Sequence, residues 1–248
     1  MTAPEVQVVE DSAALAGETA SRLLARLEEV QAAGRVPHVC LTGGGIADLV
    51  HRELARRSDT AVNWSRVEVW WGDERFLERD SDERNAVQAR RALLDHVPVD
   101  PARVHEIASR DDVPDVEAAA TAYAEELAAS GPARFDVVML GLGPDGHVAS
   151  LFPGHDEVHR SGTSAVPVHG SPKPPPERVS LTFERLNAAD AVWVIVSGES
   201  KAAALAAALE PGDLGECPAR GVRARGETLW LVDAEADAGA VGAGADAG

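Results

Sequence analysis

The segment most able to carry chemistry is residues 141–147, Gly-Leu-Gly-Pro-Asp-Gly-His, which directly follows the apolar run 135–140. An apolar run bounded by glycines is typical of a buried strand, and the glycines allow a tight turn where backbone approaches a ligand closely. His147 is the best candidate for acid–base catalysis, because an ordinary imidazole pKa of about 6.5 suits proton transfer near neutrality. Asp145 is placed to orient the imidazole or to stabilise its charged form. Taken alone, the segment fits equally well a strand-to-helix turn that merely ends in Asp and His.

A second segment, Thr42 followed by Gly43, Gly44 and Gly45, lies between a predicted strand and a predicted helix. Backbone N–H groups at the start of a helix form a seat for an anion. The loop lacks the Gly-Lys-Ser/Thr residues that end a P-loop and the G-x-G-x-x-G spacing of a dinucleotide site. It therefore favours a small phosphorylated ligand over a nucleotide.

A third segment places charged residues just past the predicted strand 67–71. Arg75 is a plausible phosphate clamp, since its planar fork suits a tetrahedral oxyanion. Asp73 is a candidate for holding sugar hydroxyls or orienting another side chain, and Asn85, at the start of the next helix, reaches the same edge. For Glu74 we expect a solvated position in a charged turn.

The charge balance adds a further clue. The formal net charge is −18, which argues against nucleic acid or an anionic membrane as a partner. Among the basic residues only Lys173 and Lys201 are lysines, and both stand in motif-like surroundings, Ser-Pro-Lys-Pro-Pro and Ser-Gly-Glu-Ser-Lys. An ammonium is a compact point charge on a flexible stem, so Lys201 is a candidate for binding a small anion.

The elements that position these residues alternate along the chain. Apolar periodicity predicts helices over 12–33, 46–57, 83–96, 116–130 and 199–209, a short helix from 145 to 152, and strands over 36–42, 67–71, 103–107, 135–140, 163–168, 178–183, 191–196 and 229–232. This order predicts an α/β fold with a doubly wound, mainly parallel sheet and helices on both faces. We expect a single domain over 1–233 and a disordered Ala/Gly/Asp tail over 234–248. Such a sheet gathers strand ends at one edge, so His147 and the cationic groups should share one cleft.

Several classes of site are disfavoured. Cys40 and Cys217 are too few for a disulfide framework, and the histidines show no metal-ligand spacing, so we expect neither metal nor cofactor. Ser150 is not in a G-x-S-x-G elbow, so a covalent intermediate is not expected. No apolar stretch approaches the ~20 residues of a membrane span, and the N-terminus has no basic signal region. We expect a cytoplasmic monomer.

Several of these motifs resemble those of the 6-phosphogluconolactonases. The resemblance runs over nearly the whole chain, and its most specific block is residues 145–153, Asp-Gly-His-Val-Ala-Ser-Leu-Phe-Pro. The other segments that carry it are 41–45, 71–75, Asn85, 171–175 and Lys201. One departure is that Ile46-Ala47 follows the glycines, where the family usually has Ser or Thr.

The resemblance implies a Rossmann-like α/β sandwich shared with amino-sugar-phosphate deaminases. It implies that His147 activates water with Asp145 nearby, and that Arg75, Lys201 and the glycine loop hold a phosphate. The expected reaction is hydrolysis of 6-phospho-D-glucono-1,5-lactone, with N–H groups near Gly44 or Gly146 stabilising the oxyanion.

Two other functions remain open. A sugar-phosphate deaminase or isomerase would use Asp73 as the base that removes a proton from carbon. A non-catalytic sugar-phosphate sensor would bind the same anion without turnover.

Overall fold

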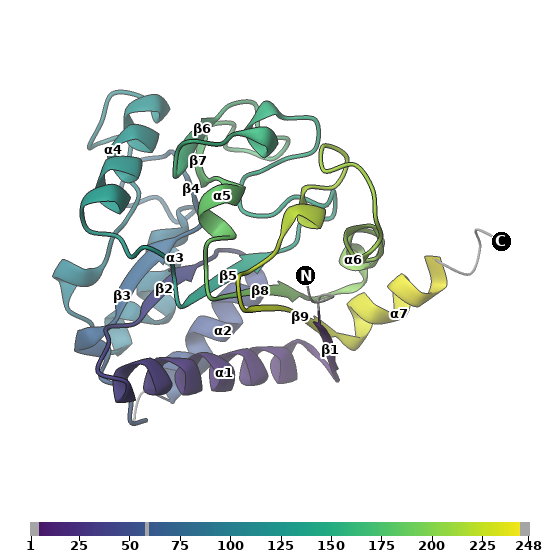
Figure 1. Ribbon diagram of the computed structural model, residues 1–248, viewed down its shortest axis with the longest axis horizontal. Helices are drawn as coiled ribbons and strands as arrows, with labels where there is room; N and C mark the ends of the chain where they lie inside the picture. The colour runs from purple at the N-terminus through teal and green to yellow at the C-terminus, as the bar shows by residue number, and fades with distance from the viewer. Residues whose placement is uncertain (1–4, 58–59, 244–248) are drawn as a thin grey trace.

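A parallel six-stranded sheet, in the order β1-β9-β8-β5-β2-β3, forms the centre of the molecule (Figure 1). The computed structural model describes residues 5–57 and 60–243. The strands of this main sheet are β1 (Glu5–Val9), β2 (His38–Leu41), β3 (Glu68–Trp71), β5 (Val137–Gly141), β8 (Ala191–Val196) and β9 (Glu227–Asp233). Every residue of β8 is buried, as expected for a strand covered on both faces. The predicted α/β fold with a mainly parallel sheet is confirmed.

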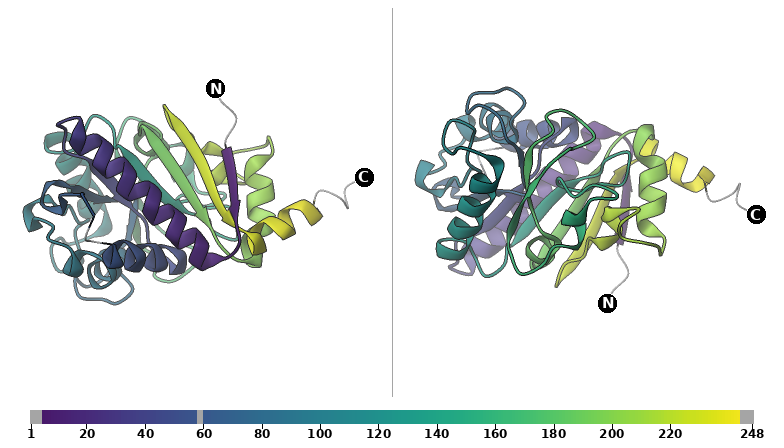
Figure 2. Two further views of the ribbon diagram at one scale, coloured as in Figure 1. Left: turned by 90° about the horizontal axis from the view of Figure 1, so that it is seen from below. Right: turned by 90° about the horizontal axis from the view of Figure 1, so that it is seen from above.

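Helices cover both faces of the main sheet (Figure 2). The helices α1 (Ser12–Ala32) and α2 (Gly45–Arg56) lie on one face, and α3 (Asn85–Ala92) packs beside α2. On the other face lie α4 (Val116–Ala129), the short α5 (Phe183–Leu186) and α6 (Ala202–Leu209). The helices α1, α2, α3, α4 and α6 were predicted from the apolar periodicity, although α3 and α6 are shorter than predicted, and α5 was not predicted.

A small antiparallel sheet, in the order β4-β7-β6, lies above the main sheet. It consists of β4 (Asp73–Arg75), β6 (Ala165–Val168) and β7 (Arg178–Leu181). Gly72 joins the two sheets: its N–H donates to Leu41 O at 3.0 Å, and its carbonyl accepts from Leu181 N at 2.8 Å. The chain therefore passes from β3 into β4 with a single residue between, which sets the small sheet over the edge where the main strands end.

Two predicted elements are wrong in type. The expected strand 103–107 makes only one bridge, between Val104 and Val69, so it adds no strand to the sheet. The expected helix over 145–152 is instead a turn in which Val148 bridges Leu151 and Ala149 has φ +50°. This segment is held under the small sheet, where the N–H of Ser150 donates to Ser180 Oγ at 3.2 Å.

The tail prediction is wrong for residues 234–243, which form α7 (Ala234–Ala243), while residues 244–248 lie outside the described part. Asp233 Oδ1 accepts from Ala236 N at 3.0 Å and thereby caps the helix. Ala236 is fully buried, so the small side chains that suggest disorder also allow close packing against α6.

The core is continuous across the main sheet and contains all five tryptophans, Trp64, Trp70, Trp71, Trp193 and Trp230. No helix in residues 5–57 and 60–243 combines the length and the apolar character that a bilayer span requires.

Candidate active site

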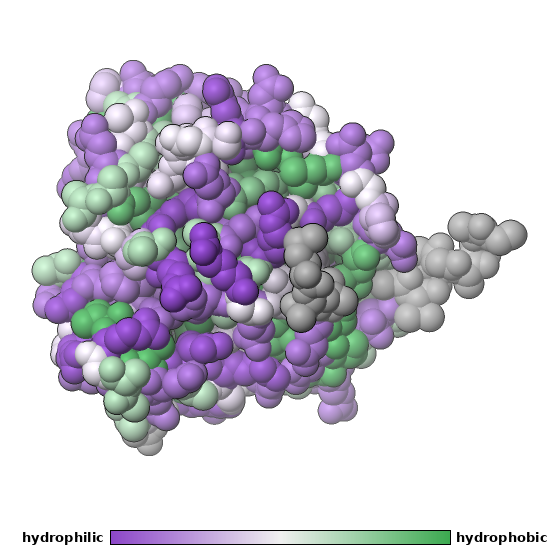
Figure 3. Space-filling model, in the orientation of Figure 1, coloured by the Kyte–Doolittle hydropathy of each residue, from purple (hydrophilic) through white to green (hydrophobic). Residues whose placement is uncertain are grey.

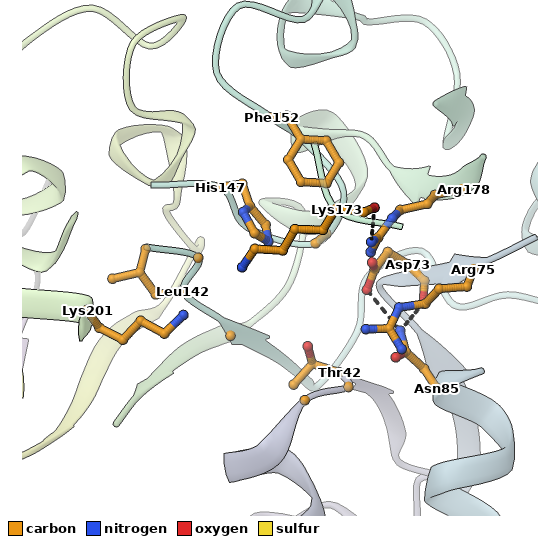
Figure 4. A pocket seen from close by; sticks show the side chains of 15 residues that line it. Thr42, Asp73, Arg75, Asn85, Leu142, His147, Phe152, Lys173, Arg178 and Lys201 are labelled. Carbon is orange, nitrogen blue, oxygen red and sulfur yellow. Dashed lines mark hydrogen bonds between the residues drawn. The ribbon is translucent and has the colours of Figure 1, made fainter. Parts of the chain in front are cut away.

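A cleft of about 180 Å³ lies between the carboxyl edge of the main sheet and the small sheet. It sits where β5 and β2 are neighbours, the point at which the chain order along the sheet reverses and where ligands of open α/β sheets bind. The three segments singled out in the sequence and the two lysines all contribute to its wall (Figure 4). The residues that line it are Thr42, Gly43, Gly44, Asp73, Arg75, Asn85, Gly141, Leu142, Gly143, His147, Ala149, Phe152, Lys173, Arg178 and Lys201.

His147 and Asp145 form a hydrogen-bonded pair, with 2.5 Å between Nδ1 and Oδ1. Burial raises the pKa of Asp145, but the hydrogen bond from His147 and its charge outweigh this, so the pKa falls to about 2. The carboxylate is therefore ionised near neutral pH and accepts from Nδ1–H. This leaves the Nε2 lone pair of the neutral ring free to accept a proton. Asp145 itself does not line the cleft.

The turn that carries this pair depends on glycine. Gly143 N donates to His147 O at 2.8 Å, and Gly146, with φ +85°, donates to Gly143 O at 3.0 Å. A Cβ at Gly143 would lie 2.0 Å from His147 Nδ1. The ring of His147 also packs against Phe152, with 4.6 Å between ring centroids. The imidazole is thus held between a closed turn and an aromatic side chain.

The glycine loop follows β2 and leads into α2. Gly44, with φ +102°, precedes the first residue of α2, and Thr42 is buried in the cleft wall. A Cβ at Gly43 would lie 1.8 Å from Asn85 Oδ1, so only glycine lets α3 come so near. Gly45 begins α2 and lines a neighbouring hollow rather than the cleft.

Asp73 is buried and already hydrogen-bonded. Its Oδ2 accepts from the Ser150 hydroxyl at 2.6 Å, and Asn85 Nδ2 donates to its carbonyl at 2.9 Å and to its Oδ1 at 3.3 Å. Asn85 Oδ1 is buried and has no hydrogen-bond partner among the described residues. It is therefore free to accept from a ligand.

Arg75 extends from β4 into the cleft, and its guanidinium donates to the Glu83 carbonyl. Its Nε is buried and, within the described part of the chain, has no acceptor. A buried donor without a partner is costly, so this position is suited to an anionic ligand.

The expectation of a solvated position for Glu74 is wrong: only 1% of this residue is exposed. Successive side chains of a strand point to opposite faces. Asp73 and Arg75 therefore face the cleft, while Glu74 faces the start of α3. Its carboxylate accepts from the N–H groups of Arg75, Asn85 and Ala86 at 2.8, 2.7 and 2.8 Å. Glu74 thus fixes the backbone of Arg75 and Asn85, which both line the cleft.

A buried ion pair completes this arrangement. Arg84 Nε lies 3.6 Å from Glu74 Oε2, and both side chains are 1% exposed. Burial raises the pKa of Glu74 to about 7, although the charge of Arg84 and the backbone N–H groups oppose the rise.

Two cations that line the cleft were not assigned to it from the sequence. Lys173 lies in the proline-rich loop and Arg178 at the start of β7. Arg178 donates to the carbonyls of Lys173 and Pro175 at 3.0 and 3.3 Å, and so holds the loop that carries Lys173. The rarity of lysine in this chain was a signal for Lys173, but no pattern distinguishes Arg178 from other arginines.

The cleft is cationic on an acidic protein. Both lysines of the chain line it, and Figure 4 shows Lys201 on one side of His147, with Arg75 and Arg178 on the other. Burial lowers the pKa of Lys201, and the charge of Lys173 lowers it further, against the influence of Asp145. The two ammonium groups are therefore close enough to repel each other, and an anion between them would relieve that repulsion.

Within residues 5–57 and 60–243, no three His, Cys, Asp or Glu side chains are grouped to hold a metal ion.

The fold and the cationic lining of the cleft are those of an α/β protein suited to a small anionic ligand. The family model described as glucosamine-6-phosphate isomerases/6-phosphogluconolactonase matches residues 10–230. The chain is 47% identical over 243 residues to a 6-phosphogluconolactonase of Streptomyces coelicolor, an alignment that covers 94% of this chain and 93% of the relative. It is 42% identical over 240 residues to one of Mycobacterium leprae, with 94% and 97% covered. A solved 6-phosphogluconolactonase from Trypanosoma brucei superposes with a TM-score of 0.84 at 26% identity, covering 95% of this chain and 98% of that one.

The chain belongs to the glucosamine-6-phosphate isomerase/6-phosphogluconolactonase family, and its relatives place it among the hydrolases of that family. Lactone hydrolysis is the reaction that these relatives support.

Proposed function

We propose that this enzyme hydrolyses 6-phospho-D-glucono-1,5-lactone to 6-phospho-D-gluconate in the cytoplasm, by attack of a water molecule that His147 activates. The observation that carries the proposal is that His147, paired with an ionised Asp145 behind it, lines a cleft that Lys201 also lines. This substrate requires a general base near its lactone carbonyl and positively charged side chains near its phosphate.

Neutral His147 accepts a proton from water at Nε2 as the water oxygen bonds to the lactone carbonyl carbon. The resulting imidazolium is stabilised by Asp145, at 2.5 Å from Nδ1. When the bond from the carbonyl carbon to the ring oxygen breaks, the imidazolium returns its proton to that oxygen. General acid–base catalysis of this kind contributes about 10²–10⁴-fold.

The phosphate, remote from the reacting carbon, supplies binding energy that positions the ester. Lys201, Lys173 and Arg75 reach the cleft from three different elements and provide the positive charge for it. Asn85 Oδ1 is the acceptor for a sugar hydroxyl.

An oxyanion forms on the carbonyl oxygen during the attack. Of the two loops considered for stabilising it, the turn at Gly146 is already engaged, because its N–H donates to Gly143 O. The Gly44 N–H, at the positive end of α2, is therefore the proposed donor.

The direct experiment is base uptake at constant pH on freshly generated phosphorylated gluconolactone, with the uncatalysed rate subtracted. We expect enzyme-dependent acid formation and no ammonia from glucosamine 6-phosphate. Ammonia release without lactone hydrolysis would instead assign the deaminase reaction with Asp73 as base. Binding of the sugar phosphate without turnover of either substrate would indicate a sensor.

A further inference from the structure

A second cavity, of about 490 Å³, lies beside α5 and the segments that precede β8 and β9. Its lining includes residues 187–188, just before β8, and residues 221–225, just before β9, so it opens at the amino edge of the main sheet. Its apolar floor includes Val158, Phe183 and Leu214. Among the described residues, none lines both this cavity and the active cleft.

Three arginines, Arg160, Arg223 and Arg225, surround this floor. Most arginines of the chain have a carboxylate oxygen within 4.0 Å. In the described part of the chain, those without one are Arg66, Arg75, Arg160, Arg178, Arg185, Arg223 and Arg225.

The distribution of these unpaired arginines is informative. Arg75 and Arg178 line the active cleft, where a negatively charged substrate is expected, and Arg185 lies over the ring of Phe135. The three around the second cavity form the other group. A chain of net charge −18 has ample carboxylates for pairing, so guanidinium groups gathered without them mark a place for an external anion.

The loop that carries Arg223 and Arg225 is held by residues 187–189. Asn187 Oδ1 accepts from Arg223 N at 3.0 Å, and Asn187 Nδ2 donates to Gly221 O at 2.8 Å. Arg225 N donates to Ala189 O at 3.0 Å. The cavity is therefore built from anchored backbone.

Glu184 is the single acidic residue in the described lining. It holds the loop that follows Arg160 and forms no ion pair with the arginines of the cavity. Glu184 accepts from Gly162 N at 2.7 Å through Oε2. In the space-filling view, strongly hydrophilic side chains gather at the centre of this face, beside α5, with hydrophobic surface next to them (Figure 3).

The lining specifies the chemistry of a ligand. Guanidinium groups bind phosphate oxygens in a bidentate manner and stack on planar rings, and an apolar floor beside them favours a ligand with a ring. The volume is in the range of small-molecule sites, about 300–1,000 Å³. We propose that this cavity binds a nucleotide, with its phosphates on Arg160, Arg223 and Arg225 and its base against the floor at Phe183.

Isothermal titration calorimetry of the full chain with ADP tests this. We expect saturable binding with a Kd below about 1 mM, at least tenfold weaker binding to an Arg223→Gln/Arg225→Gln double variant, and an unchanged Kd for Arg66→Gln. Arg66 is the matched control, since it is also exposed and, among the described residues, has no carboxylate partner, but it lies far along the chain, at the end of a short 3₁₀ helix. Lys201→Ala should bind ADP like the unmodified chain.

Titrations with inorganic pyrophosphate and with adenosine separate the anion from the ring, and each should bind at least tenfold more weakly than ADP. Pyrophosphate binding as tightly as ADP would overturn the nucleotide assignment, as would the absence of saturation. Loss of binding in Lys201→Ala but not in the double variant would move the event to the active cleft. Tighter binding of a pentaglutamate peptide than of ADP would assign the surface to an acidic protein partner instead.

Discussion

Replacing Asp145 by Asn isolates the charge that supports the imidazolium of His147. Asn keeps an oxygen that accepts from Nδ1–H, so the ring orientation and tautomer are retained while the negative charge is lost. The fall in the pKa of Asp145 from the usual 3.8 to about 2 corresponds to about 2.4 kcal/mol. Because about a third of the carboxylate is solvent-exposed, screening reduces this to about 1–1.5 kcal/mol. That is about a tenfold effect on a step in which the imidazole becomes charged.

Base-uptake measurements over a range of lactone concentrations give kcat and KM separately. We expect Asp145→Asn to lower kcat by about 5- to 13-fold and to leave KM within about twofold, since the charge matters only once His147 holds the proton. Asp156→Asn, the same change at an exposed site, should have no effect. An unchanged kcat in Asp145→Asn would refute the reasoning, and so would a rise in KM by the same factor as the fall in kcat. A loss beyond about 10³-fold would mean that the carboxylate sets the tautomer, as in buried triads.

Three other variants have definite outcomes. Lys201→Ala should raise KM for the phosphorylated lactone at least tenfold, because a cation of the phosphate seat is lost, and spare turnover of unphosphorylated gluconolactone; equal losses on both substrates would contradict this. Gly143→Ala should lower kcat at least 100-fold, because the new Cβ overlaps His147 Nδ1. The control Gly45→Ala, which has open space around its Cβ, should remain active. A fully active Gly143→Ala would contradict the turn geometry. Glu74→Gln should lower the free energy of unfolding at pH 5, where Glu74 is protonated in the folded state, by about 1–3 kcal/mol, since the amide nitrogen cannot accept from the buried Ala86 N–H; an unchanged denaturant midpoint would contradict that role.

The raised pKa of Glu74 also has a pH signature. Between about pH 4.5 and about pH 7 the folded state holds a proton on Glu74 that the unfolded state has released. This group's contribution to stability therefore falls as pH rises through that window and is constant above it. Denaturation curves across the window should show a decline that is absent in Glu74→Gln. Parallel curves for the two proteins would show that Glu74 does not titrate there.

The sequence was sufficient to predict five of the six strands of the main sheet and the edge that carries the site; the edge strand β1, which is half-exposed, was not predicted. Continuous apolar runs such as β8 have few other interpretations, and the ends of parallel strands must meet at one edge. This is why His147 and Lys201, 54 positions apart in the chain, were predicted to share the cleft that they do line.

Features that depend on distant pairing were not predictable. The three residues of β4 form a strand only because β7, more than a hundred residues later, pairs with them. The same pairing turns Glu74 inward, where backbone N–H groups and Arg84 replace its water. Arg178 faces the cleft for a similar reason, since its place depends on the small sheet and not on any local pattern.

The most direct test of the catalytic assignment is His147→Ala, measured both for lactone turnover and, by calorimetry, for affinity toward 6-phosphogluconate. Loss of the general base should lower kcat by about 10²–10⁴-fold, while the Kd for the product stays within about threefold because the cations of the cleft are untouched. Turnover by His147→Ala at the rate of the unmodified enzyme would contradict the assignment of His147 as the base.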